Sequence, residues 1–202
     1  MMCRFTCLLL SCVLILMTAC KEQNKTPQEY MESAIKLYHE QRDTGEIIGV
    51  LSEGIALYPE NLPLIQFSTT LYCEQGMLAE CRTSTVRLLE LKPDLIEAST
   101  MLCMLDEFEG AGQEQCDVCY GAFLPLFDAR FPAATPELEV ANKATYVFTL
   151  FMARHPDAEK EKQALFARVA EDSSLTWLYQ GMFENFDRRK VLRGIFNKNA
   201  EK

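Results

Sequence analysis

Residues 37–41 read LYHEQ and residues 71–75 read LYCEQ, so one short pattern returns after 34 positions. The same shift places Pro59 on Pro93, and an acidic residue follows each of these prolines. A period of 34 residues with a proline closing each unit is typical of an array of helix-turn-helix units. The stretch 26–94 therefore predicts stacked helical hairpins, and it decides the fold class.

The rest of the chain also carries apolar residues at helical spacing, without long strand-like alternation. We expect an all-α chain of about ten helices. The period is lost after Pro132, so we expect the array over residues 26–131. Residues 132–202 are expected to form an irregular helical extension that packs on the array within the same domain. Pro125 lies inside a helix expected over residues 115–130, where it predicts a kink or a break.

Residues 28–93 resemble two units of the tetratricopeptide repeat family, and the chain up to about residue 131 resembles a third unit more loosely. Tyr38 and Tyr72 stand at the eleventh position, where the family has an aromatic residue. The resemblance implies a binding scaffold of helical hairpins. At the eighth and twentieth positions, where the two helices of a unit touch, the family has small residues. This chain has larger ones, which implies wider helix packing: Ile35, Ile47, Thr69 and Cys81.

The resemblance also implies an inner, concave face lined by the first helix of each unit. Six carboxylates and one lysine fall at its lining positions, so the face is expected to attract a protein or peptide with a basic surface. The alternative is a solvated acidic face without a partner. The residues expected to contact the partner are Glu29, Glu32, Lys36, Glu40, Gln66, Thr70, Glu74, Glu97, Met104 and Glu107.

The N-terminus predicts a secretory signal over residues 1–19, because one charge, Arg4, precedes an apolar run. That run is shorter than the ~20 residues of a membrane span. Thr18, Ala19 and Cys20 resemble a bacterial lipobox, which implies that Cys20 is acylated and becomes the new N-terminus. Residues 20–25 would then form a polar tether.

Three alternatives for the N-terminus stay open. One is a rival lipobox that ends at Cys12, and the others are an ordinary signal peptide and a retained anchor helix. Lys21 follows Cys20. By the same resemblance, the lack of an aspartate there implies the outer membrane, facing the periplasm.

The composition excludes some partners. The chain of 202 residues has a formal net charge of −9. Nucleic-acid binding needs Lys/Arg patches, so no nucleic-acid partner is expected. Wide contact with anionic lipid is disfavoured for the same reason, which leaves membrane attachment to the acyl chains.

Five cysteines follow the lipobox, and the oxidising periplasm favours pairing. Cys73 and Cys81 lie on either side of an expected turn between two helices, so we expect them to pair. The resemblance puts Cys103 at the eighth position of the third unit and Cys116 near the twentieth, which implies a second bond and leaves Cys119 free. A Cys116–Cys119 redox pair, or buried thiols throughout, are the alternatives.

Catalytic and metal-binding patterns are absent from the sequence. The two histidines, His39 and His155, lie far apart, and neither has the spaced partner that zinc sites use. No Gly-x-Ser-x-Gly, phosphate-binding loop or Gly-x-Gly-x-x-Gly occurs. We therefore expect neither an enzyme nor a cofactor.

The sequence as a whole predicts a lipid-anchored scaffold that faces the periplasm and binds another protein. One alternative is the T component of a tripartite periplasmic transporter, since those proteins also resemble tetratricopeptide lipoproteins. That function would favour a large apolar cavity lined by Phe108, Phe123, Phe127 and Phe151. The other alternative is an immunity lipoprotein that neutralises a secreted toxin, because such proteins are often small, acidic and lipid-anchored.

Overall fold

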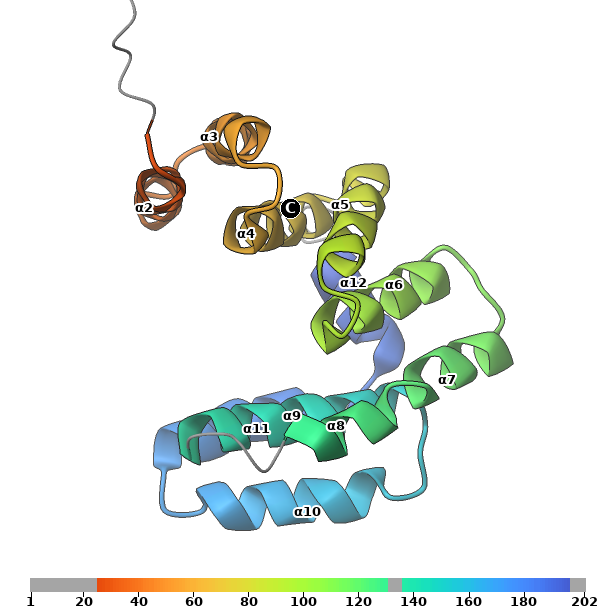
Figure 1. Cartoon of the computed structure of the whole chain (residues 1–202). Coiled ribbons are helices and arrows are strands. Elements are labelled where there is room, and N and C mark those ends of the chain that lie inside the picture. The colour runs from red at the N-terminus through yellow and green to blue at the C-terminus, as the bar shows by residue number, and fades with distance from the viewer. Residues whose placement is uncertain (1–24, 131–135, 197–202) are drawn as a thin grey trace, which may run out of the picture. The chain divides into compact units, whose positions relative to one another are not determined.

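The computed structural model describes residues 25–130 and 136–196. This part of the chain is all-α and contains no strand, as the sequence predicts. Cys20 and the rest of the expected signal and tether up to residue 24 lie outside it. The chain divides into two compact units between Leu64 and Ile65, whose relative placement is not determined (Figure 1).

The helices follow one another with short connections, and their starts recur at intervals of 34 or 35 residues through the first half of the chain. First helices of a hairpin begin at residues 27, 62 and 96, and second helices begin at residues 44, 78 and 113. The expected period is therefore present in the backbone. The first-half helices are α2 (Pro27–His39), α3 (Thr44–Leu57), α4 (Leu62–Glu74), α5 (Leu78–Leu91), α6 (Ile96–Phe108) and α7 (Gln113–Gly121).

The second half of the chain shows no such period. Ala122 and Phe123 interrupt the helix expected over residues 115–130 and separate α7 from α8. Pro125 then lies in the first turn of α8, where its missing N–H leaves no hydrogen bond unmade. The remaining helices are α8 (Leu124–Arg130), α9 (Pro136–Met152), α10 (Ala158–Val169), α11 (Ser173–Phe183) and α12 (Arg188–Phe196).

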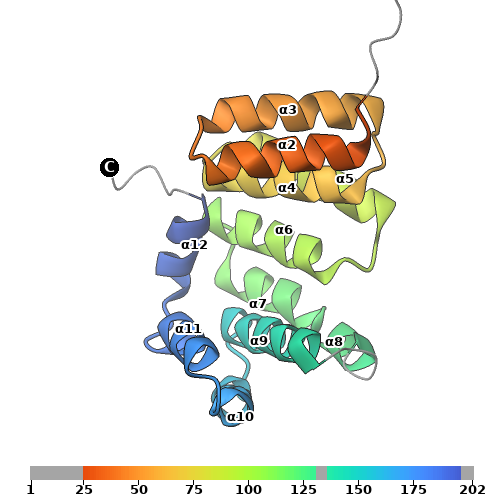
Figure 2. The ribbon, with the colours of Figure 1, turned by 90° about the vertical axis from the view of Figure 1, so that its left-hand side faces the viewer.

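The first unit is built on the hairpin of α2 and α3, which lie side by side and antiparallel (Figure 2). A capping box starts α2, because Thr26 N donates to Glu29 Oε2 at 2.6 Å and Glu29 N donates to Thr26 Oγ1 at 3.3 Å. The small core of the unit contains Tyr30, Ala34, Ile47, Leu51 and Leu64.

The two helices approach closely at Gly54 of α3. A Cβ atom built there would lie 2.9 Å from Tyr30 Cγ and 3.1 Å from Leu64 Cδ1. Gly49, one and a half turns earlier in α3, has open space around the same position. The hairpin therefore needs a residue without a side chain at Gly54 and tolerates one at Gly49.

We predict that Gly54→Ala destabilises the fold by about 1–3 kcal/mol, because the added methyl group overpacks the contact with Tyr30. Gly49→Ala is the matched control, and it should stabilise the fold by about 0.4–1 kcal/mol through the unfolded chain. Urea unfolding followed by circular dichroism measures both changes. Equal stability of the two variants would contradict the close contact.

The second unit contains α4 from Ile65 onward with α5, the hairpin of α6 and α7, the short helix α8, a group formed by α9, α10 and α11, and finally α12. Side chains of α4, α5, α6, α7 and α12 meet in its first hydrophobic cluster. Its second cluster joins α9, α10 and α11 through Val147, Leu165, Val169, Tyr179 and Phe183. Figure 2 shows α12 beside α6, and α11 next to α12 along the same edge. On α11, Trp177 points away from the cluster and is 77% exposed.

A disulfide links the two helices of each hairpin of the second unit. Cys73 in α4 pairs with Cys81 in α5, as predicted, with Cα atoms 5.1 Å apart. Cys103 in α6 pairs with Cys119 in α7, with Cα atoms 5.8 Å apart, and Cys116 is a buried free thiol. The expected Cys103–Cys116 bond, with Cys119 left free, is therefore wrong.

The correction follows from the register of an antiparallel hairpin. Cys103 lies five residues before the end of α6, and Cys119 lies six residues after the start of α7. Each residue advances a helix by ~1.5 Å, so positions equally far from the turn face each other. Cys116 lies only three residues into α7, too near the turn to reach Cys103, and its Sγ atom lies 3.7 Å from Ala111 O.

We predict that alkylation in denaturant without reductant labels Cys116 and leaves Cys119 unlabelled. Cleavage on the amino side of Asp117 separates the two cysteines, so peptide mass spectrometry assigns the label. Native protein should resist the reagent, because Cys116 is buried and burial raises the pKa of its thiol, which leaves little reactive thiolate. A label on Cys119 would restore the rejected pairing.

Candidate functional site

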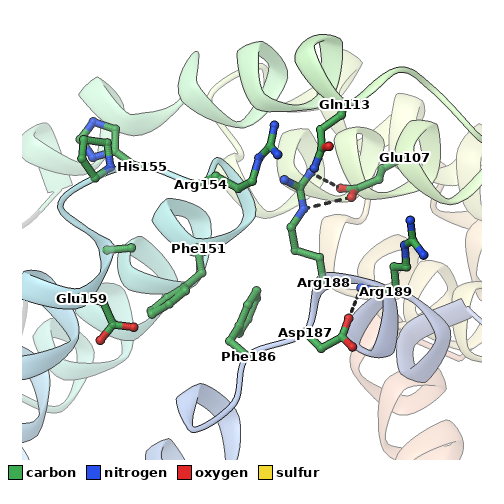
Figure 3. A pocket seen from close by; sticks show the side chains of 12 residues that line it. Glu107, Gln113, Phe151, Arg154, His155, Glu159, Phe186, Asp187, Arg188 and Arg189 are labelled. Atoms are coloured by element: carbon green, nitrogen blue, oxygen red, sulfur yellow. Dashed lines mark hydrogen bonds and ion pairs between the residues drawn. The ribbon is translucent and has the colours of Figure 1, made fainter.

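The most concentrated polar site of the second unit forms around Arg188, the first residue of α12. Its Nε atom donates to Glu107 Oε1 of α6 at 3.0 Å, and its Nη1 atom donates to Asp117 Oδ1 of α7 at 2.9 Å. Its Nη2 atom lies 2.8 Å from Glu107 Oε2, without hydrogen-bond geometry. One guanidinium therefore ties the start of α12 to two other helices, and Figure 3 shows its contact with Glu107.

These groups are largely withdrawn from water. The side chains of Arg188, Glu107 and Asp117 are 11%, 17% and 24% exposed, so solvent screens their attraction little. The Arg188 guanidinium also lies 5.6 Å from the centre of the Tyr120 ring. Burial lowers the pKa of Arg188, but hydrogen bonds to Glu107 and Asp117 outweigh it, so the pKa lies above its ordinary value. Arg188 is a permanent cation at this site.

Tyr120 of α7 completes the cluster. Its hydroxyl group donates to Glu107 Oε2 at 2.9 Å. Burial raises the pKa of Tyr120 strongly, and the nearby charge of Glu107 raises it further. Tyr120 therefore stays a neutral donor, which excludes it as a base.

Arg154 adds a second cation from the turn that follows α9. Its Nε atom donates to both carboxylate oxygens of Asp117, at 3.3 and 3.2 Å, and its Nη2 atom also pairs with Asp117. Burial raises the pKa of Asp117, but the hydrogen bonds from Arg154 and Arg188 outweigh it. The pKa of Asp117 therefore lies below its ordinary value.

A pocket of about 670 Å³ opens beside this cluster, as Figure 3 shows. Phe151 and Phe186 form an aromatic wall, with ring centres 4.9 Å apart. The acidic groups of the lining already have partners: Asp187 accepts from the N–H groups of Arg189 and Lys190, and Glu159 pairs with Lys162 at 2.5 Å. The pocket lacks the nucleophile and base pair that covalent catalysis requires.

Two of the residues expected to contact a partner are used inside the molecule. Met104 is 5% exposed and packs in the cluster that contains Leu192 and Phe196 of α12, and Glu107 binds Arg188. The expectation of an open groove along the third hairpin is therefore wrong, because α12 covers its first-helix face. The helix that covers this face is the basic one, α12, which the sequence places last among the described helices.

The other expected contact residues are divided between the two units. Glu29, Glu32, Lys36 and Glu40 are exposed on α2 in the first unit. In the second unit, Glu74 is half-buried, whereas three of the expected residues are exposed, namely Gln66, Thr70 and Glu97.

The two histidines show no catalytic geometry. His39 is exposed, and His155 Nδ1 accepts a hydrogen bond from Asp157 N at 3.2 Å within its own turn. Residues 25–130 and 136–196 hold no group of His, Cys, Asp and Glu side chains suited to a metal ion. The same described ranges contain no helix long and apolar enough to span a membrane.

The four phenylalanines named for a solute cavity lie in different surroundings. Phe108 and Phe123 pack against the cluster that contains Tyr120, and Phe127 is 2% exposed with its ring against Tyr146. Only Phe151 of the four lines the pocket beside Arg188.

Sequence reasoning missed Arg188, Asp117 and Arg154 as site residues. The sequence offers one indication for Asp117, because a charged residue between Cys116 and Cys119, in a helix with buried cysteines, needs a charged partner. The sequence offers one for Arg188 too, as the first of three consecutive basic residues in an acidic chain.

Comparison with known proteins adds no family: no family model, curated protein or solved structure matches this chain.

We predict that Asp117→Asn lowers the free energy of unfolding by about 1–3 kcal/mol at neutral pH, because two arginines lose their charged acceptor. The folded pKa of Asp117 is depressed, so its contribution is complete above the ordinary carboxyl pKa of ~3.9. The contribution is lost as pH falls from that value through the folded pKa. The difference in unfolding free energy between wild type and variant should therefore shrink on acidification, as urea titrations at several pH values would show. A difference that stays constant down to pH ~2 would contradict the ion pairs.

Proposed function

We propose that the chain is a lipid-anchored scaffold of the bacterial cell envelope that binds another protein through the acidic face of its first hairpin. The observation that carries this proposal is the exposed face of α2. Glu29, Glu32 and Glu40 are exposed there, and the one lysine among them, Lys36, lies 3.8 Å from Glu40. The face is therefore net negative, which suits a basic protein surface.

The recurring hairpins support the scaffold part of the proposal. Their first helices are each 13 residues long in α2, α4 and α6. Stacked hairpins of this period present extended binding surfaces, and each repeat adds one first helix to the surface. The tetratricopeptide resemblance of residues 28–93 agrees with this function.

The third hairpin supplies a second argument. Two periods of 34 residues relate Lys36, His39 and Glu40 to Met104, Glu107 and Phe108. The face of α6 at those positions holds a basic helix, α12, through Glu107 and Phe108. The equivalent face of α2 is exposed and carries its own carboxylates, which favours a basic partner there too.

The envelope location rests on the lipobox resemblance at Cys20 and on the disulfides. Two disulfides support an oxidising compartment such as the periplasm. Lys21 after the acylated cysteine favours the outer membrane, with the protein facing the periplasm.

We predict that Cys20→Ser abolishes incorporation of labelled palmitate when the chain is made in a bacterium. Cys12→Ser, which removes the rival lipobox cysteine, should leave the label in place. Fractionation should move the Cys20→Ser protein out of the membrane fraction. Loss of the label from the Cys12 variant alone would disprove the assignment.

Affinity capture from envelope membranes with the acylated chain tests the binding surface. We predict that Glu32→Gln with Glu40→Gln slows association of the captured partner and lowers the salt dependence of its binding rate, because the α2 face loses its attraction for basic groups. The control variant, Glu53→Gln with Glu60→Gln, removes the same charge from exposed positions elsewhere in the first unit.

Surface plasmon resonance at several salt concentrations measures both rates. Equal association rates for the two double variants would place the partner on another surface. Capture that is indifferent to salt would argue against a basic partner.

A further inference from the structure

The helix that covers the third hairpin is amphipathic, and its buried side is a single stripe. Arg188, Leu192 and Phe196 recur every four residues, so they lie on one face of α12. Leu192 is 4% exposed and Phe196 is 1% exposed. This helix of nine residues thus buries both apolar side chains of the stripe, Leu192 and Phe196, against one surface.

The surface beneath that stripe has an apolar floor and an acidic end. Phe196 packs its ring on Phe108, with ring centres 5.1 Å apart, and both apolar side chains of the stripe share a cluster with Met104 and Cys73. Beyond this floor the chain turns at Gly76. A Cβ atom built on Gly76 would lie 3.0 Å from the carbonyl oxygen of Phe196. At the other end Glu107 and Asp117 hold Arg188. The surface therefore recognises a helix by one cation and two apolar side chains.

The outer side of α12 is basic. Arg189, Lys190 and Arg193 are exposed, and within the described part of the chain none of the three pairs with a carboxylate. In a chain with a net charge of −9, this leaves one short helix with concentrated positive charge.

Three features favour exchange of this helix. Isolated helices shorter than ~12–15 residues are marginal in water, so α12 owes its helical state to the surface it covers. Its connection to α11 spans residues 184–187 and includes Asn185 in the left-handed region, with φ of 58°. The helix follows every other helix in the described chain, so it can leave its surface without displacing another one.

We propose that the face of α6 under α12 is a helix-binding groove, and that α12 is its resident occupant in place of a helix from a partner protein. The partner helix carries an arginine, a leucine four residues later and an aromatic residue eight residues later on one face. This helix-in-groove recognition uses the same spacing that α12 shows. The inference rests on the proposed function, because the partner is again a protein, but it concerns a different surface from the α2 face.

The test uses the full chain and a fluorescein-labelled synthetic peptide of residues 187–196. The chain variant Leu192→Asp with Phe196→Asp removes the apolar stripe of α12 and should vacate the groove. We expect the peptide to bind this variant saturably in fluorescence anisotropy and to bind wild type about tenfold more weakly or worse, because the resident helix competes. The control peptide carries Arg188→Glu and Leu192→Asp, and it should bind neither chain.

A third chain adds Glu107→Arg to the double variant, and it should lose peptide binding. A double variant that keeps its helical content and both disulfides but fails to bind the peptide would overturn the inference. If the double variant does not fold, hydrogen exchange of wild type decides: α12 amides should exchange faster than those of α6, and equal protection would overturn the inference.

The remaining outcomes separate the occupants and the two proposals. If wild type forms dimers that are lost on substitution of Leu192, the groove binds α12 of a second copy of this chain, and the proposal of a partner helix is rejected. Peptide binding without any captured envelope protein would sink the proposed function and keep the groove. Capture of an envelope protein that depends on Glu32 and Glu40, without peptide binding to the double variant, would support the proposed function and reject the groove.

Discussion

The ion pairs of Arg188 decide how the second unit is assembled. The Arg188 side chain, which is 11% exposed, draws together a carboxylate of α6 and a carboxylate of α7, and Arg154 in the turn after α9 shares the second of them. Buried charges are costly unless they are paired and hydrogen-bonded, so each of these groups requires the others. Three helices, α6, α7 and α12, and the turn after α9 are thereby held in one arrangement.

The two disulfides act on a smaller scale, within each hairpin. They link α4 to α5 and α6 to α7, and their sulfur atoms lie in the cluster that Leu192 and Phe196 complete. The first hairpin has no disulfide and instead brings its helices close at Gly54.

How much of this was predictable depends on sequence separation. The hairpins, the capping box at Thr26, the break before Pro125 and the Cys73–Cys81 bond depend on residues within one hairpin, so periodicity and turn residues indicate them. The Cys103–Cys119 bond was not predicted, because the partner of Cys103 was chosen by repeat position, which favours Cys116, and not by distance from the turn, which favours Cys119. The α12 contacts were out of reach, since Arg188 lies 81 residues from Glu107 and 71 from Asp117. No periodicity connects residues so far apart.

The single tryptophan gives this molecule an unusual optical property. Trp177 lies on the outer side of α11, away from the side chains that form the cores. An indole ring in water emits at long wavelength, so the native chain should already show the red-shifted fluorescence usually associated with denatured protein. Intrinsic emission would then respond weakly to unfolding and strongly to any molecule that covers α11, which makes the residue a built-in reporter of surface contact.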